Sequence, residues 1–162
     1  MKLRIIVGLL FIFLGLTVQG KTLNQNFDRS AFYAVMASGK IGEVNEELLL
    51  LNSASINEKE AYEGALLMRK GGLEKIPAEK LKFFKKGRIK LEMALLKDGN
   101  NGEYHFLRLT IQENAPKIVK YRSEINIDKQ QIKKSFKNLS SVVQQAILDY
   151  SKNSKILHSK DF

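Results

Sequence analysis

Residues 76–116 read IPAEKLKFFKKGRIKLEMALLKDGNNGEYHFLRLTIQENAP, and their pattern decides the fold that we expect. Pro77 suits the first turn of a helix, where its missing N–H removes no hydrogen bond. Apolar residues then recur at helical spacing and form one stripe, Leu81, Phe84, Leu91 and Leu95. A second apolar face of the same helix carries Ile89, Met93 and Leu96. A helix that is apolar on two sides is expected to lie between neighbours.

The turn-forming residues 98–102 (DGNNG) predict that the chain reverses direction after this helix. Tyr104, Leu107 and Ile111 would then pack back against it, so residues 76–116 form a helical hairpin at the centre of the fold. Alternating apolar and polar residues leave another reading open, in which 104–112 and 117–127 form a β-hairpin. We favour a helix because the surrounding sequence is helical and Pro116 follows a suitable helix end.

Five further helices are expected on the two sides of this hairpin. Residues 28–38, ending at Gly39, and residues 42–51 form a first pair. A helix over 57–70 begins with a capping-box spacing, Asn57 to Glu60, and carries small residues at Ala61, Gly64 and Ala65 that would let a neighbouring helix approach closely. Asp128 is expected to cap the next helix, over 128–137.

The last main helix is expected to start at Ser140 or Ser141 and to continue through Tyr150. With a short ambiguous segment at 117–121, the chain adds up to an all-α fold of about seven helices in antiparallel hairpins. The arrangement would be tetratricopeptide-like or an irregular helical bundle. We expect the lysine-rich tail from about residue 152 to be loosely held.

The N-terminus has the order of features found in a secretory signal peptide. Lys2 and Arg4 precede the apolar run of residues 5–16, and the small, more polar residues 17–20 (TVQG) follow. The run is shorter than the roughly 20 residues that span a bilayer as a helix. We expect cleavage after Gly20 and export to the periplasm or beyond. An uncleaved anchor and a buried core helix are the alternatives.

Residues 21–162 are long enough for one domain and too few for two comfortable ones. The chain has no cysteine, so it has no disulfide, no thiolate metal site and no lipid attachment at a cysteine after the signal. No transmembrane segment is expected after signal cleavage. The oligomeric state does not follow from the sequence.

Two resemblances support a helical fold. Residues 91–101 (LEMALLKDGNN) resemble the end of a tetratricopeptide repeat, with Leu91 and Ala94 at its large and small positions and Gly99 in place of its usual proline. Residues 61–72 (AYEGALLMRKGG) and 103–118 (EYHFLRLTIQENAPKI) resemble small exported helical proteins of Bacteroidota-type bacteria. This resemblance implies a helical fold and export, and no particular activity.

Three arginines, Arg69, Arg88 and Arg108, each fall on the apolar side of the expected helix. The ordinary explanation is that the aliphatic part of an arginine side chain packs against the core while its guanidinium group reaches solvent at the edge. Alternatively, the three converge on a groove between helices, where a carboxylate or phosphate would bind. Glu92, one turn after Arg88, could instead neutralise Arg88 locally.

The chain is basic, with a net charge of +10, and Lys82, Lys86 and Lys90 share one expected helix face. These lysines form a candidate surface for binding a polyanion, although charged runs on helices usually face solvent. Export argues against nucleic acid as the partner. His105 and His158 have no ligand-like spacing and are expected at the surface. We expect no metal and no cofactor, and no catalytic motif is present.

These observations predict a non-enzymatic, exported helical domain that binds a protein or an envelope component through a groove between its hairpins. A small enzyme that uses Arg69, Arg88 or Arg108 with a carboxylate is one alternative. A polyanion-binding module that uses the basic helix face is the other.

Overall fold

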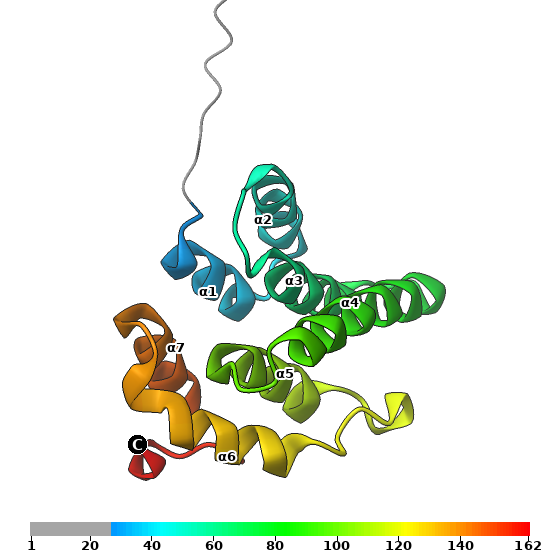
Figure 1. The fold of residues 1–162 in the computed structure, drawn as a ribbon. Helices are drawn as coiled ribbons and strands as arrows, with labels where there is room; N and C mark the ends of the chain where they lie inside the picture. The colour runs from blue at the N-terminus through cyan, green and yellow to red at the C-terminus, as the bar shows by residue number, and fades with distance from the viewer. Residues whose placement is uncertain (1–26) are drawn as a thin grey trace, which may run out of the picture.

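The structure, a computed structural model, describes residues 27–162 of the chain. The signal peptide expected over residues 1–20 lies outside the described residues. Seven α-helices account for most of the described chain (Figure 1): α1 (Arg29–Ser38), α2 (Ile41–Ser53), α3 (Lys59–Leu73), α4 (Pro77–Lys97), α5 (Gly102–Asn114), α6 (Ile125–Ser135) and α7 (Ser141–Ser151). Three short 3-10 turns, η1 (Lys117–Val119), η2 (Phe136–Asn138) and η3 (Ser159–Asp161), complete it.

The all-α prediction is therefore confirmed, and adjacent helices pack in contact. The β-hairpin alternative is wrong, because residues 102–114 form α5 and residues 117–119 form the turn η1. Several local signals act as expected. Pro77 stands at the start of α4, and Gly39 ends α1 in a left-handed conformation with φ of 69°. None of the helices within residues 27–162 is long and apolar enough to cross a membrane.

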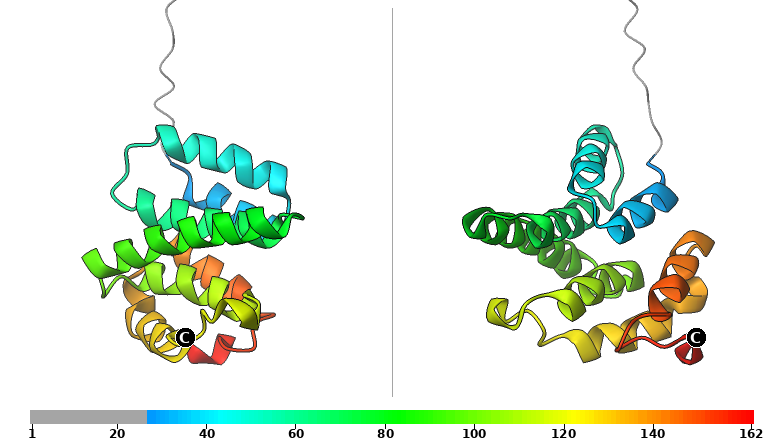
Figure 2. Two further views of the ribbon diagram at one scale, coloured as in Figure 1. Left: turned by 90° about the vertical axis from the view of Figure 1, so that its right-hand side faces the viewer. Right: turned by 180° about the vertical axis from the view of Figure 1, so that it is seen from behind.

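The main partner of α4 is α3, not α5 as the hairpin prediction required. Glycines make this possible, because the two backbones touch where the helices cross. A Cβ on Gly64 would lie 2.9 Å from the carbonyl oxygen of Gly87, and a Cβ on Gly87 would lie 2.7 Å from the backbone nitrogen of Met68. Both separations are shorter than real side chains allow. The close approach expected from the small residues of α3 is thus present, and α4 runs alongside α3 (Figure 2).

Within residues 27–162, the second apolar face of α4 has no neighbouring helix. Ile89 is 66% exposed, Met93 45% and Leu96 80%. The prediction that α4 lies between helices on both sides is wrong within the described part of the chain, because α5 meets α4 only slightly. The helix that does lie between neighbours is α5, which is buried along nearly its whole length.

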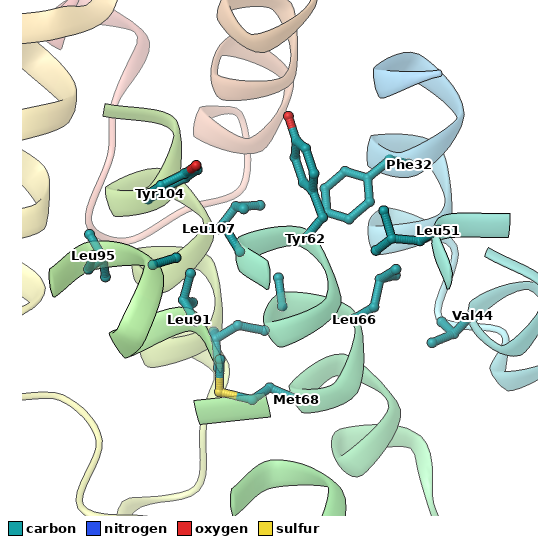
Figure 3. Close-up of a cluster of buried hydrophobic side chains, with 14 of the residues drawn as sticks. Phe32, Val44, Leu51, Tyr62, Leu66, Met68, Leu91, Leu95, Tyr104 and Leu107 are labelled. Atoms are coloured by element: carbon teal, nitrogen blue, oxygen red, sulfur yellow. The ribbon is translucent and has the colours of Figure 1, made fainter. Parts of the chain in front are cut away.

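Two apolar clusters form the core, and α5 contributes to both. In the first, Tyr104 and Leu107 of α5 meet side chains from α1 to α4, including Phe32, Tyr62 and Leu91 (Figure 3). In the second, Phe106 and Leu109 of α5 meet residues of α6, α7 and the C-terminal segment, among them Ile132, Ile147 and Leu157. The first and last of the seven described α-helices, α1 and α7, are also in contact, so the two ends of the helical arrangement meet (Figures 1 and 2).

The segment after α7 is packed, which corrects the expectation of a loosely held tail. Leu157 is fully buried in the second cluster, and the ring of Phe162 stacks on Phe136 with 4.5 Å between ring centres. Lys133 donates a hydrogen bond of 3.0 Å to Asp161. The lysine-rich composition suggested solvation, but Leu157 is buried and Ile156 and Phe162 are partly buried.

Two expected helix caps are also wrong. Helix α3 begins at Lys59, and its N-cap residue, Glu58, makes no side-chain cap, so Asn57 and Glu60 form no capping box. Helix α6 begins at Ile125, so Asp128 stands inside the helix and is fully buried rather than capping its end. The reason is that Asp128 has a stronger partner in α5 than the helix end offers, as described below.

Candidate functional site

A large open groove of about 1570 Å³ lies between α1, the C-terminal end of α3, the first half of α4, α5 and α7. Most of its lining is apolar, and the apolar residues come from every one of these elements. They include Tyr33, Ala34, Met68, Leu81, Phe84, Phe106, Leu107, Ile111, Val142 and Ala146. The segment that includes η1 adds Pro116, Ile118 and Val119. This groove is our candidate functional site.

Arg69 lines the groove from the last turns of α3. It makes no hydrogen bond and no ion pair with any residue of 27–162, and its Nε is buried without a partner. Its terminal nitrogen lies beside Gly39, where an added Cβ would be 3.2 Å away. The partly negative C-terminal end of α1 favours a cation here, but the buried N–H of Arg69 still lacks an acceptor.

Arg88 lines the groove from α4 and lies over the ring of Tyr121, with 4.8 Å between the guanidinium carbon and the ring centre. No carboxylate within residues 27–162 forms an ion pair with it. The expected local neutralisation by Glu92 is wrong, because Glu92 binds Arg108 and Tyr121 instead. The ring holds the guanidinium plane and leaves its hydrogen-bond donors available.

Arg108, the third candidate, lies outside the groove lining and has carboxylate partners. Its Nη2 donates to Oδ1 of Asp128 at 2.7 Å, its Nε to Oδ2 of Asp128 at 3.0 Å, and its Nη1 to Glu92 at 2.9 Å. Burial works to lower the pKa of Arg108, but the hydrogen bonds and charges of Asp128 and Glu92 raise it above its ordinary value. Arg108 is therefore a fully paired cation in the core.

His105 and Tyr121 complete what we call the Arg108 network: Glu92, His105, Arg108, Tyr121 and Asp128. The Nδ1 atom of His105 lies 2.6 Å from Asp128, and its Nε2 lies 3.0 Å from the carbonyl oxygen of Gly99. Burial, followed by the hydrogen bond to Glu92, raises the pKa of the Tyr121 hydroxyl well above its ordinary value. The network joins α4, the turn after it, α5 and α6 into one unit.

His105 is 4% exposed, so its expected surface position is wrong, whereas His158 is exposed as expected. No motif pointed to the His105–Asp128 contact, because the two residues have no motif spacing. A hint was available in the helical periodicity of α5, where His105, Arg108 and Gln112 share one face. Gln112 is fully buried as well, and its amide has no partner among the described residues.

A second buried polar cluster lies on the opposite side of α5. Tyr33 and Tyr62 both donate hydrogen bonds to Oε1 of Glu103, at 2.8 and 2.6 Å, and Arg29 donates to the hydroxyl of Tyr62 at 2.7 Å. Burial raises the pKa of Glu103 above its ordinary value, and the two tyrosines and Arg29 oppose part of that rise. The Tyr33 side chain reaches the groove wall, so this cluster fixes one wall in place.

The three lysines of the candidate basic face have different surroundings. Lys82 pairs with Glu79 on its own helix at 3.2 Å, and Lys90 reaches across to Glu63 of α3 at 3.0 Å. Lys86 is exposed and forms no ion pair within the described residues. The described chain also contains no group of three or more carboxylates and histidines placed to hold a metal ion.

Comparison of the chain with protein-family models, curated proteins and solved structures finds no match.

Proposed function

We propose that this protein is a non-catalytic binding domain, exported by its N-terminal signal, that holds a segment of another protein or of an envelope component in the groove. The observation that carries the proposal is the groove itself, whose volume of about 1570 Å³ exceeds the roughly 300–1,000 Å³ of small-molecule sites. A surface of this size and apolar character is typical of an interaction site.

Two features support binding rather than catalysis. The one assembly of histidine, carboxylate and arginine in the described chain, the Arg108 network, satisfies its own members and does not line the groove. The groove arginines, Arg69 and Arg88, have no histidine or carboxylate bound to them within the described residues. General acid–base chemistry needs a proton donor or acceptor within hydrogen-bond reach of the substrate. The arginines supply charge and hydrogen-bond donors, which are binding functions.

A site-specific photo-crosslinking experiment in the producing cell tests the proposal. Leu81 and Ile89 are matched positions, because both are exposed apolar residues of α4, 47% and 66% exposed, but only Leu81 lines the groove. We expect a photoreactive residue at position 81 to give one or a few defined adducts, and the same residue at position 89 to give none. Equal adducts from both positions, or none from position 81, would contradict the proposal.

The export part of the proposal has its own test. Mass spectrometry of the protein purified from the producing organism should give a mature N-terminus at Lys21. A chain that retains Met1 in the cytoplasm would refute export while leaving the groove proposal standing.

A further inference from the structure

The charges that line the groove are satisfied on one wall only. On the α5 and α7 side, Glu113 accepts hydrogen bonds from Tyr150 at 2.7 Å and from Ser154 at 2.6 Å, and Asp149 pairs with Lys152 at 2.6 Å. The acidic groups of the groove thus have partners from the chain itself.

The opposite wall carries four cations that line the groove and form no ion pair with any residue in the described part of the chain. They are Arg69 of α3 and Lys80, Lys85 and Arg88 of α4. Arg69 adds a buried N–H without an acceptor. The Arg69 Nε is shielded by the protein itself, but the charges of the four cations are not compensated by any described residue, and an anionic ligand supplies that compensation. The missing partner of this wall is therefore negatively charged.

The cations on α4 are spread along the helix and are not gathered at one point. Lys80 and Arg88 stand two turns apart, which separates their backbone positions by about 12 Å at 1.5 Å per residue. Leu81 and Phe84 lie between the cations and also line the groove. A ligand with several anionic groups at about one-turn spacing, beside an apolar surface, therefore complements this wall better than a single carboxylate or phosphate does.

An amphipathic helix with an acidic edge has these properties. Its side chains at positions i and i+4 lie one above the other, so two or three carboxylates can follow the row on α4 while its apolar stripe faces the groove floor. Helices bind in apolar grooves of this kind through regularly spaced anchors. A lipid carries its charge at one end of its chains and would leave most of the row without a partner.

We propose that the groove takes an amphipathic helix of a partner protein, with acidic residues one turn apart aligned along Lys80, Lys85 and Arg88 of α4. This inference rests on the proposed function, because it names the ligand class of the same groove. The floor formed by Phe84, Leu107 and Ile111 receives the apolar face of that helix. Arg69, on the neighbouring helix α3, receives a further carboxylate.

Fluorescence anisotropy with synthetic peptides tests the inference. The purified full chain is titrated into two labelled peptides of about 18 residues, or five turns, with the same leucine stripe. One carries glutamate at one-turn spacing along one edge, and the other carries lysine at those positions. We expect the acidic peptide to bind at least about tenfold more tightly, and its affinity to fall as salt is added, because opposite charges attract across a partly exposed interface.

Matched variants locate the contact. Lys85→Gln combined with Arg88→Gln should weaken binding of the acidic peptide by about tenfold, because each removes a charged contact. Lys82→Gln combined with Lys86→Gln removes the same charge from the same helix outside the groove lining, and should leave the affinity unchanged. Equal losses in the two variants would show that net charge alone attracts the peptide, and would overturn the inference.

The remaining outcomes separate the inference from the proposed function. Equal binding of the two peptides, or binding of neither while position 81 still forms crosslinks in the cell, overturns the acidic helix and keeps the groove as a protein-binding site. Failure of both experiments overturns both. Sedimentation with anionic phospholipid vesicles that depends on Lys85 and Arg88, without peptide binding, would assign the cationic row to a lipid surface and also overturn the inference.

Discussion

The interface between α5 and α6 and the wall of the groove both contain arginine, but only the interface pairs it with carboxylates. Arg108 is surrounded by Asp128 and Glu92 at 2.7–3.0 Å, whereas Arg88 has the ring of Tyr121 and Arg69 has no partner among residues 27–162. The same residue type on the same apolar side of a helix thus has a structural role in one region and is available to a ligand in the other. The difference lies in what the neighbouring helix brings to it.

The largest loss of folding stability is expected when the buried ion pair between Arg108 and Asp128 is broken. Asp128→Ala leaves Arg108 and His105 buried without their shared partner, and removing one member of a buried ion pair costs about 3–5 kcal/mol. Urea unfolding followed by circular dichroism measures this loss. Glu79→Ala removes a half-buried carboxylate of α4 that pairs, among the described residues, only with the exposed Lys82, and should change the free energy of unfolding by less than about 1 kcal/mol. An Asp128→Ala variant as stable as Glu79→Ala would show that the Arg108 network contributes nothing.

The next largest loss of stability is expected from a change that separates α3 and α4, the two helices that carry the groove arginines. Gly87→Ala places a methyl group against the backbone of α3, so the helices must separate, and we expect a loss of about 1–3 kcal/mol from overpacking. Gly72→Ala on α3 is the matched control, because nothing lies within 4 Å of its added methyl group. That change should stabilise the helix by about 0.5–1 kcal/mol. Two variants of equal stability would contradict the close crossing of α3 and α4.

A smaller, pH-dependent effect is expected from Glu103, a buried carboxylate with tyrosine partners instead of a full arginine pair. Its pKa is raised by burial above the ordinary value of 4.5, so the folded state binds its proton more readily than the unfolded state does. This group therefore lowers stability above its folded pKa, and the penalty disappears as the pH falls towards 4.5.

Glu103→Gln keeps an oxygen acceptor for Tyr33 and Tyr62 and removes the charge. We expect the stability of the wild type to rise relative to this variant as the pH is lowered from neutral, measured by urea unfolding at each pH. Comparison with the variant cancels the contributions of the other carboxylates. A difference between the two proteins that stays constant with pH, or changes in the opposite direction, would contradict the raised pKa.

The smallest effects on stability are expected at the groove arginines. Arg88→Gln loses a stacking contact worth about 0.5–1 kcal/mol at an exposed site. Arg69→Gln should change stability even less, because Arg69 has no partner to lose within the described chain. Arg108→Gln, by contrast, should approach the loss expected for Asp128→Ala. Similar losses at all three arginines would remove the distinction drawn above.

Local signals predicted most of the helices. Pro77 and Gly39 act at the ends of helices through their own backbone preferences, so they needed no knowledge of the rest of the fold. The small residues of α3 correctly indicated a close neighbour, although the sequence did not show that Gly87 of α4 would be the other half of the contact.

Several of the errors have one physical cause, since they concern residues whose partners come from elsewhere in the chain. Asp128 has the local pattern of a helix cap, and its partner Arg108 stands 20 residues earlier. Glu92 stands one turn from Arg88, yet pairs with Arg108, 16 residues away. The sequence placed Arg69, Arg88 and Arg108 together as candidates because periodicity assigns a helix face. Which arginine finds a carboxylate depends on how the helices are arranged.

The packed C-terminal segment bears on how far the chain can be shortened. Leu157 completes the second apolar cluster, and Asp161 lies close to two lysines of α6, at 3.1 Å from Lys129 and 3.0 Å from Lys133. A truncation before residue 154 would keep α7 but leave a cavity at the position of Leu157 and remove both ion pairs of Asp161. The first cluster, built from α1 to α5 and Tyr121, contains none of the residues lost in this way. Trimming this segment therefore weakens one half of the core and leaves the other half intact.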